Sequence, residues 1–366
     1  MKNNTFHIDF RLNDTSFSSV EELIDFSKTL SLSTNRFFVE CFSDSEYIEV
    51  QTSGSTGKPK IIQLKKEFMR NSALATGEFF NLFGKTSVLL CMSTDYIAGK
   101  MMLVRALTLG WHIDIVEPIS NPLKELKKEY DFSAMVPMQL KNSLSDIHKI
   151  KKLIIGGGVV TQELEMQLQS ISTEVYATFG MTETCTHIAV KKLNQFTNID
   201  SNTSEKLHYK VLPNVSISQD HRNCLVINAS KIAENQIVTN DIVEIVSETE
   251  FKWLGRFDTV INSGGVKLHP EEIEKKLSKI ITQRFFVAGV PDKVLGEKLI
   301  LVIEENITSK AVEEFLKIQL MSDFRKIKNI TNYEIPKEIH FVENFIETET
   351  KKIQRVKMLD TLLKTN

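Results

Sequence analysis

The chain has 366 residues, of which 42% are hydrophobic and 25% charged, and its formal net charge at pH 7 is −2. These values fit a globular protein of two or three domains and give no general attraction to nucleic acid or anionic membranes. The cysteines Cys41, Cys91, Cys185 and Cys224 lack paired spacing, so neither a disulfide framework nor a zinc site is predicted. We see no apolar signal segment or membrane span and expect a cytoplasmic protein.

Short apolar runs alternate with helical patterns along the first 250 residues, which indicates an α/β protein. The pattern becomes β-rich from about Cys224 to Leu254. Strands are predicted at 87–92, 112–117, 152–155 and 174–178, and helices at 97–109 and from Thr161.

A second set of predicted helices and strands begins after residue 255. His269 is followed by Pro270 and two glutamates, a strong helix start because proline suits the first helical position and acids suit the first turn. Strands at 285–290 and 298–304, a helix from about Ser309 and a terminal helix at 358–364 follow. We therefore predict an N-terminal domain of residues 1–255 and a C-terminal domain of residues 256–366.

The segment QTSGSTGKPK at residues 51–60 combines hydroxyls, glycines and lysines, as a polyphosphate-binding loop requires. It is not a Walker loop, because only two residues separate Gly54 from Gly57 and a proline follows Lys58. The alternative is a flexible Ser/Gly turn before a helix. The predicted nucleotide-binding residues here are Thr52, Ser53, Gly54, Ser55, Thr56, Gly57 and Lys58.

The segment TFGMTET at residues 178–184 ends a predicted strand, where α/β sheets usually bind ligands. Phe179 can stack on a purine, Thr182 can donate to a phosphate, and Glu183 can hold Mg²⁺ through oxygen. Gly180 and Met181 complete the predicted nucleotide site. The alternative is an ordinary strand-to-helix turn.

Both segments resemble motifs of the acyl-adenylate-forming, or AMP-binding, superfamily, which includes acyl-CoA synthetases, luciferases and adenylation domains of peptide synthetases. Phe179 stands where that superfamily has tyrosine. The resemblance implies a large N-terminal α/β domain with a β-rich end and a small mobile α+β C-terminal domain. It also implies that the chain uses ATP, Mg²⁺ and, as cosubstrate, CoA, with a small carboxylic acid as substrate.

Several shorter motifs extend the resemblance. Gly156 and Gly157 resemble the turn that forms one wall of the adenine site, with Gly158 toward the acyl group; a simple left-handed connector is the alternative. Asp241 matches the aspartate that binds the ribose hydroxyls, although Asn240 replaces the usual glycine. A hairpin turn is the alternative reading of this pair.

The block from Gly255 to Glu274 resembles a second, highly specific motif. By that resemblance Arg256 contacts the nucleotide, Asp258 is the hinge between domains, and Gly264 and Gly265 line the passage for pantetheine. The alternative, a helix cap after a glycine loop, explains Pro270 but not the whole block.

The segment KKIQR at residues 351–355 resembles the Gly-Lys-x-x-Arg motif and implies that Lys352 is the catalytic lysine. Lys351 occupies the usual glycine position, so which of the two lysines acts stays open. A basic patch on a solvated helix is the alternative.

Segments 95–100, 134–140 and 182–189 most resemble compact ortho-succinylbenzoate–CoA ligases of menaquinone synthesis. Tyr96 replaces the first residue of the His-x-x-Gly element in the acyl site. The predicted function is an ATP-dependent acid–CoA ligase; the alternatives are another aryl- or acyl-CoA ligase, or a stand-alone enzyme that adenylates an acid for a carrier protein. The candidate partners for a second substrate carboxylate are His187, Thr186, Arg105 and Lys100.

Overall fold

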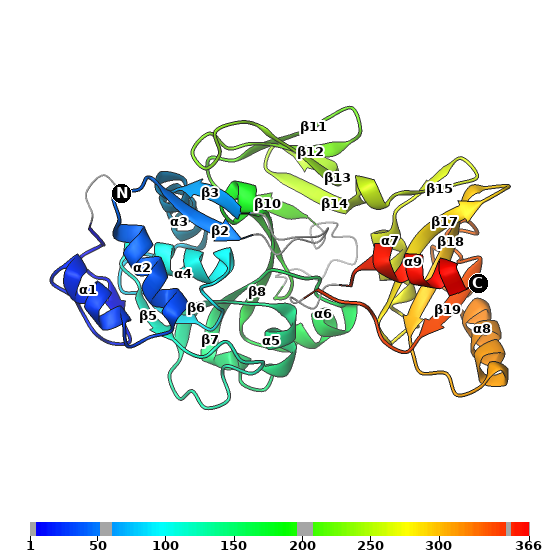
Figure 1. Ribbon diagram of the computed structural model, residues 1–366, viewed down its shortest axis with the longest axis horizontal. Coiled ribbons are helices and arrows are strands. Elements are labelled where there is room, and N and C mark those ends of the chain that lie inside the picture. The colour runs from blue at the N-terminus through cyan, green and yellow to red at the C-terminus, as the bar shows by residue number, and fades with distance from the viewer. Residues whose placement is uncertain (1–4, 52–60, 196–207, 349–352, 366) are drawn as a thin grey trace. The chain divides into compact units, whose positions relative to one another are not determined.

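The computed structural model describes residues 5–51, 61–195, 208–348 and 353–365 (Figure 1). The predicted phosphate loop at 52–60 and both candidate lysines, Lys351 and Lys352, lie outside the described residues. The chain divides into two compact units. The first comprises Met1–Ser218, Val226–Val238 and Ile245–Lys252, and the second comprises Gln219–Leu225, Thr239–Glu244 and Trp253–Asn366.

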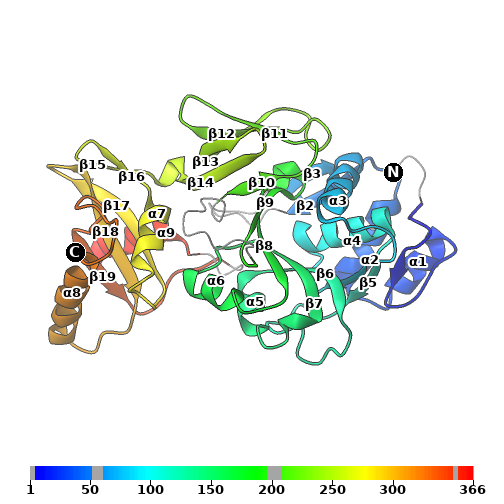
Figure 2. The same ribbon diagram turned by 180° about the vertical axis from the view of Figure 1, so that it is seen from behind.

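A parallel sheet forms the centre of the first unit (Figure 2). Its strand order is β1-β5-β4-β6-β7-β8, and all these neighbours pair in parallel. β9 and β10 continue the sheet in antiparallel orientation. The bounds are β1 Arg11–Leu12, β4 Ser87–Leu90, β5 His112–Ile115, β6 Tyr130–Met135, β7 Ile150–Ile155, β8 Glu174–Gly180, β9 His187–Lys192 and β10 Tyr209–Val211.

Side-chain alternation gives this sheet two apolar faces. Val88 and Leu90 pack into one core cluster, whereas Leu89, between them, packs into another. The first cluster includes residues of α1, α2, α3 and α4, and the second includes residues of α5 and α6, so helices cover both faces, as parallel sheets require. The helices are α1 Val20–Ser27, α2 Leu32–Phe42, α3 Lys66–Phe80, α4 Ile97–Leu109, α5 Pro137–Asn142 and α6 Gln162–Leu168.

A two-stranded antiparallel ribbon, β2 (Tyr47–Gln51) and β3 (Ile61–Lys65), borders the predicted phosphate loop. Gln51 pairs with Ile61. The last residue before the loop and the first residue after it are therefore held opposite one another.

The β-rich region contains β11 (Ser216–Gln219), β12 (Cys224–Asn228), β13 (Ile237–Ser247) and β14 (Glu250–Arg256). The sheet order continues through β14, β13, β12 and β11, and the division between the units passes through these strands. Asn240 and Asp241 lie inside β13, so the hairpin-turn reading of this pair is wrong. Thr239, Asp241, Ile242 and Val243 are buried in this 11-residue strand, whereas Asn240 and Glu244 are exposed.

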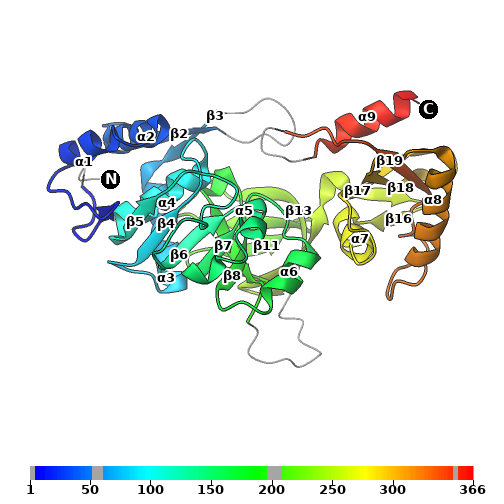
Figure 3. The same ribbon diagram turned by 90° about the horizontal axis from the view of Figure 1, so that it is seen from below.

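The second unit has a mixed five-stranded sheet of order β16-β15-β18-β17, with β19 parallel to β18. α7 and α8 contribute to the core on one face, and α9 contributes to a separate core on the other (Figure 3). The bounds are β15 Ile261–Ser263, β16 Val266–Leu268, α7 Pro270–Leu277, β17 Phe285–Asp292, β18 Gly296–Glu304, α8 Lys310–Phe324, β19 Glu338–Val342 and α9 Arg355–Thr365.

The predicted α/β class is confirmed, with a β-rich end and an α+β C-terminal part. The predicted helix at 97–109 coincides with α4, and Thr161 caps α6 by accepting a hydrogen bond from the Leu164 N–H. Within the described residues, no helix is both long and apolar enough to cross a membrane.

Candidate active site

The segment after β8 forms a tight, internally bonded turn. Gly180 is the last residue of β8, and a Cβ there would lie 2.3 Å from the carbonyl oxygen of Thr186, so only glycine fits. Residues Thr182–Thr184 form one turn of 3₁₀ helix, and the Thr184 hydroxyl accepts a hydrogen bond from the Met181 N–H at 3.2 Å. The turn thus has a fixed shape, from which Thr182 and the exposed Glu183 project.

Phe179, the predicted adenine-stacking residue, is held by two other aromatic rings. Its centroid lies 5.7 Å from that of Tyr209 and 5.2 Å from that of Phe251, both in edge-on geometry. Tyr209 and Phe251 pair across β10 and β14. Their role was missed in the sequence, because neither belongs to a motif and only the strand register brings them to Phe179.

The glycine segment lies beside the β8 segment. Gly157 has a φ of +78°, which makes the left-handed connector correct for this residue. A Cβ on Gly156 would lie 2.9 Å from the Thr178 Oγ1, and a Cβ on Gly158 would lie 3.3 Å from Pro137. The parallel pairing of β7 and β8 therefore brings two separate motifs together at the carboxyl edge of the sheet.

The candidate acyl-site residues separate into two groups. Tyr96 is the N-cap of α4 and is exposed, but Lys100 donates to the backbone carbonyl of Glu49 at 3.0 Å and lies 3.9 Å from Glu40. Lys100 therefore has partners away from the other candidates. Arg105, Thr186 and His187 do meet, because one guanidinium nitrogen lies 3.4 Å from both the Thr186 Oγ1 and the His187 Nδ1.

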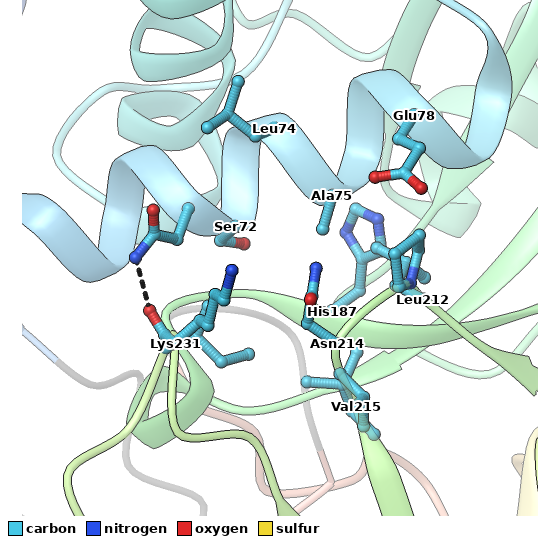
Figure 4. Close-up of a pocket in the computed structure, with 13 residues that line it drawn as sticks. Ser72, Leu74, Ala75, Glu78, His187, Leu212, Asn214, Val215 and Lys231 are labelled. Atoms are coloured by element: carbon cyan, nitrogen blue, oxygen red, sulfur yellow. Dashed lines mark hydrogen bonds between the residues drawn. The ribbon is translucent and has the colours of Figure 1, made fainter.

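His187 borders a cavity of about 220 Å³ in the first unit (Figure 4). Its ring lies beneath α3 near Ala75, and Leu212 and Asn214 also line the cavity. Burial, followed by the charge of Arg105, lowers the pKa of His187 well below its ordinary value, so the imidazole is neutral at pH 7.

In the second unit, Asp241, Arg256 and Asp258 form one charged cluster. Arg256 donates two hydrogen bonds to the Asp258 carboxylate, at 2.9 and 3.0 Å, and its Nη1 lies 3.8 Å from Asp241. Trp253 donates its indole N–H to Asp241 at 3.0 Å. Burial raises the pKa of Asp241, whereas the hydrogen bonds from Arg256 lower the pKa of Asp258.

Gly264 and Gly265 connect β15 to β16. Their φ angles are +58° and +82°, which is the pattern of a two-residue type I′ hairpin turn. The turn alone thus accounts for glycine at both positions, and the pantetheine passage stays a prediction.

Two motif residues that the sequence did not connect form an ion pair. Arg355, just after the lysine pair, contacts both carboxylate oxygens of Glu274 in α7, at 2.9 and 3.0 Å. Glu274 also accepts the backbone N–H of Val287 at 2.9 Å, and Arg355 lies over the ring of Phe286. The arginine of the C-terminal motif therefore anchors the start of α9 to α7 within the second unit.

A magnesium ion in this site would have to be held largely by the phosphate oxygens of a bound substrate. Within the described ranges, no group of three or more His, Cys, Asp or Glu side chains could hold a metal. Glu183 is exposed and has no hydrogen-bond or ion-pair partner among those residues. One carboxylate together with phosphate oxygens is the usual way proteins bind Mg²⁺, so the site fits this ion.

The chain is similar to a known protein family and to several solved structures. The AMP-binding enzyme family matches residues 43–218. An acyl-CoA synthetase (AMP-forming)/AMP-acid ligase II-like protein from Dyadobacter fermentans is 35% identical, with 92% of this chain and 98% of that chain covered and a TM-score of 0.59. The o-succinylbenzoate CoA synthetase of Bacillus subtilis, solved with an acyl-adenylate intermediate, has a TM-score of 0.71 at 19% identity, covering 85% of this chain and 68% of that one.

Among curated relatives, the 2-succinylbenzoate–CoA ligase of Staphylococcus aureus (strain MRSA252) is 25% identical over 84% of this chain. The present chain spans 65% of the length of that relative. The 35% identity over nearly the whole Dyadobacter protein and the family match over the phosphate-loop and β8 segments agree. The chain therefore belongs to the AMP-binding enzyme family.

Proposed function

We propose that the protein is an ATP-dependent acid–CoA ligase that acts on ortho-succinylbenzoate. It joins a carboxylate to the α-phosphate of ATP, releasing pyrophosphate, and then transfers the acyl group to the thiol of CoA, releasing AMP. Another aryl or acyl acid, or a carrier protein in place of CoA, remains the second candidate because the motifs are common to all three.

The observation that carries the proposal is the meeting of the glycine segment and the β8 turn at one edge of the parallel sheet. Gly156 lies against Thr178, and the turn that follows presents Thr182 and Glu183. In α/β sheets, ligands bind outside the carboxyl ends of the strands. A nucleotide here would meet backbone N–H groups, one hydroxyl and one carboxylate.

The chemistry requires that charge on the phosphate oxygens be stabilised while two anions are brought together. Thr182 donates to a phosphate oxygen, and the 52–60 loop, with Lys58, holds the leaving pyrophosphate. Lys352 bridges the substrate carboxylate and the α-phosphate. Glu183 would hold Mg²⁺, which would supply further neutralising charge.

The second unit contributes the ribose and hinge functions in this proposal. Asp241 accepts the ribose hydroxyls and Arg256 contacts the nucleotide. Asp258 is the hinge about which residues 256–366 turn, withdrawing Lys352 and admitting CoA between the two steps. Gly264 and Gly265 line the passage of the pantetheine arm.

The test is a pair of assays on the purified chain with a panel of carboxylic acids. ATP–pyrophosphate exchange reports the first step, and AMP release with CoA reports both. We expect both to be fastest with ortho-succinylbenzoate. Absence of exchange with every acid would contradict the adenylating function.

The same panel separates the second candidate from the first. Strong exchange with ortho-succinylbenzoate but no thioester with CoA would favour loading of a carrier protein. A preference for medium-chain fatty acids would exclude the narrow substrate while leaving the ligase chemistry in place.

A further inference from the structure

Asp241, the predicted ribose-binding carboxylate, is held by a side chain that belongs to none of the sequence motifs. The residue is 6% exposed, and its Oδ1 accepts a hydrogen bond from the indole N–H of Trp253 at 3.0 Å. Trp253 lies in β14, which is the neighbour of β13, the strand of Asp241 (Figure 2). Within the described part of the chain, this is the only hydrogen bond that the Asp241 carboxylate accepts.

Arg256 does not supply a second hydrogen bond to Asp241. Its Nη1 lies 3.8 Å from the Asp241 Oδ2, which is beyond hydrogen-bond distance. Its Nε and Nη2 donate instead to Asp258, at 2.9 and 3.0 Å, so the charge of Arg256 is largely satisfied by that residue. The Oδ2 of Asp241 therefore has no donor among the residues that the structure describes.

A buried carboxylate with a single neutral donor is costly, because the hydrogen bonds that it loses to water are only partly replaced. Burial raises the pKa of Asp241, and the indole hydrogen bond, followed by the charge of Arg256, opposes that rise. Burial also raises the pKa of the nearby Cys224, which is a neutral thiol at pH 7. Trp253 is thus the direct contact that keeps Asp241 charged. A charged group kept in such surroundings indicates a functional site.

The indole also fixes the orientation of the carboxylate. The last torsion of an aspartate side chain is broad, so the two oxygens have no fixed direction by themselves. An indole has one N–H and can only donate, so Trp253 holds Oδ1 in one place. Oδ2 then faces the side of Arg256 and is available to a hydroxyl donor. A ribose hydroxyl is a donor of this kind.

We propose that Trp253 is a positioning residue that orients Asp241 so that its Oδ2 accepts a hydroxyl of the ATP ribose. The inference rests on the proposed function, because it takes Asp241 as the partner of the ribose. It deepens that function by naming the residue that sets the preference for ribonucleotides over deoxynucleotides. Trp253 acts through Asp241 and needs no contact with the reacting atoms.

The test compares ATP with 2′,3′-dideoxy-ATP, which lacks both ribose hydroxyls, in the pyrophosphate exchange assay. For the wild type, kcat/KM for ATP should exceed that for the dideoxy nucleotide by about 10- to 100-fold, as for hydrogen bonds to a charged group. Asp241→Asn should remove most of this preference. Trp253→Phe keeps an aromatic ring but loses the N–H, and should reduce the preference about three- to tenfold.

The other tryptophan of the chain provides a matched control. The Trp111 indole donates to the carbonyl oxygen of Leu82 at 3.3 Å in the first unit. Trp111→Phe removes the same chemical group from a core position and should leave the preference for ATP unchanged. Equal loss with both nucleotides in Trp253→Phe would mean a merely structural role and overturn the proposal. Equal behaviour of the two phenylalanine variants, or an unaltered preference in Asp241→Asn, would overturn it as well.

A second readout does not need catalysis. Trp111→Phe leaves Trp253 as the only tryptophan, so incorporation of benzothienylalanine in that background replaces its N–H by sulfur with little change in size. In calorimetric titrations this protein should bind Mg-ATP about three- to tenfold more weakly than Trp111→Phe, and 2′,3′-dideoxy-ATP equally well. Equal affinity of the two proteins for ATP would refute the positioning role. If no acid supports exchange, the proposed function fails, whereas the titrations still test the role of Trp253.

Discussion

The sequence suggested two arginines, Arg105 and Arg256, as anion-binding groups, and their surroundings differ. Arg105, in the first unit, is enclosed and contacts only neutral atoms. Arg256, in the second unit, is partly exposed and is held by the Asp258 carboxylate, with Asp241 nearby. Among the described residues, no carboxylate competes for the charge of Arg105. Arg256, by contrast, must release the Asp258 carboxylate before its guanidinium can bind another anion.

The difference indicates how each charge can be used. An enclosed charge costs free energy in every state of the protein and cannot readily exchange its partners. A charge paired with a carboxylate can be released when a nucleotide competes, because surface pairs contribute only about 0–1 kcal/mol. If Asp258 is the hinge, the release of Arg256 would also free the hinge residue. Substitutions of charged and titratable residues in the two units extend this contrast, in order of decreasing expected effect.

The largest effect is expected from the C-terminal lysines. Lys352→Ala should slow pyrophosphate exchange about 1,000-fold, because one positioned donor to developing charge contributes that order of magnitude. Thioester formation from supplied acyl-adenylate should be much less affected. Lys351→Ala is the matched control and should retain most exchange activity; the reverse result would identify Lys351 as the catalytic lysine.

The Arg355–Glu274 pair should have a structural effect of intermediate size. Arg355→Met leaves the Glu274 carboxylate unpaired, and we expect the free energy of unfolding to fall by about 1–3 kcal/mol. This loss is smaller than for a fully buried ion pair, because both side chains are partly exposed. The double variant Arg355→Met/Glu274→Met should recover part of that loss. Unchanged stability in the single variant would show that α9 is anchored without this pair.

Arg256→Gln should reduce kcat/KM for ATP about 10- to 100-fold, since it removes a charged contact to the nucleotide. The free energy of unfolding should change by less than about 1 kcal/mol, because Arg256 and Asp258 are both partly exposed to solvent. Arg284→Gln removes another exposed arginine of the second unit, which pairs with Glu304, and serves as control. Similar kinetics for the two variants would remove Arg256 from the nucleotide site.

The smallest effect concerns acid stability. Because the pKa of His187 lies well below its ordinary value in the folded state, the unfolded chain takes up a proton near pH 6.5 that the folded chain does not. Stability should therefore fall as the pH drops below about 6.5, by up to about 1.4 kcal/mol per pH unit from this group. His187→Gln should flatten this part of the curve measured by chemical denaturation. An unaltered slope would indicate that His187 is charged in the folded protein.

Much of the fold could be predicted from the sequence. The helix at 97–109 and the strands around Gly156 and Phe179 follow from periodicity and from glycine at strand ends, which are local signals. The alternative reading of Asn240 and Asp241 as a hairpin turn also rested on a local signal and is wrong, because pairing with neighbouring strands and burial of Asp241 keep both residues extended. Strand pairing and burial therefore outweighed the local preference of these two residues for a turn.

The site was predictable only as separate motifs. Each motif identified residue types, but the contacts between them depend on strand register and helix packing, which the sequence alone does not specify. The contact of Arg355 with Glu274 and that of Phe179 with Tyr209 are examples. The separation of Lys100 from Arg105 is another, because five residues along α4 place the two side chains on different neighbours.

The burial of all four cysteines has a practical consequence. Burial raises the pKa of Cys41, Cys91 and Cys185 to about 12 and that of Cys224 in the same direction, so these thiols should be inert toward alkylating dyes at neutral pH. Cysteines introduced at the exposed positions Leu32 and Val294, one in each unit, would then accept a fluorophore pair without background. Energy transfer between the labels during turnover would test the proposed rotation of residues 256–366 about Asp258 in single molecules.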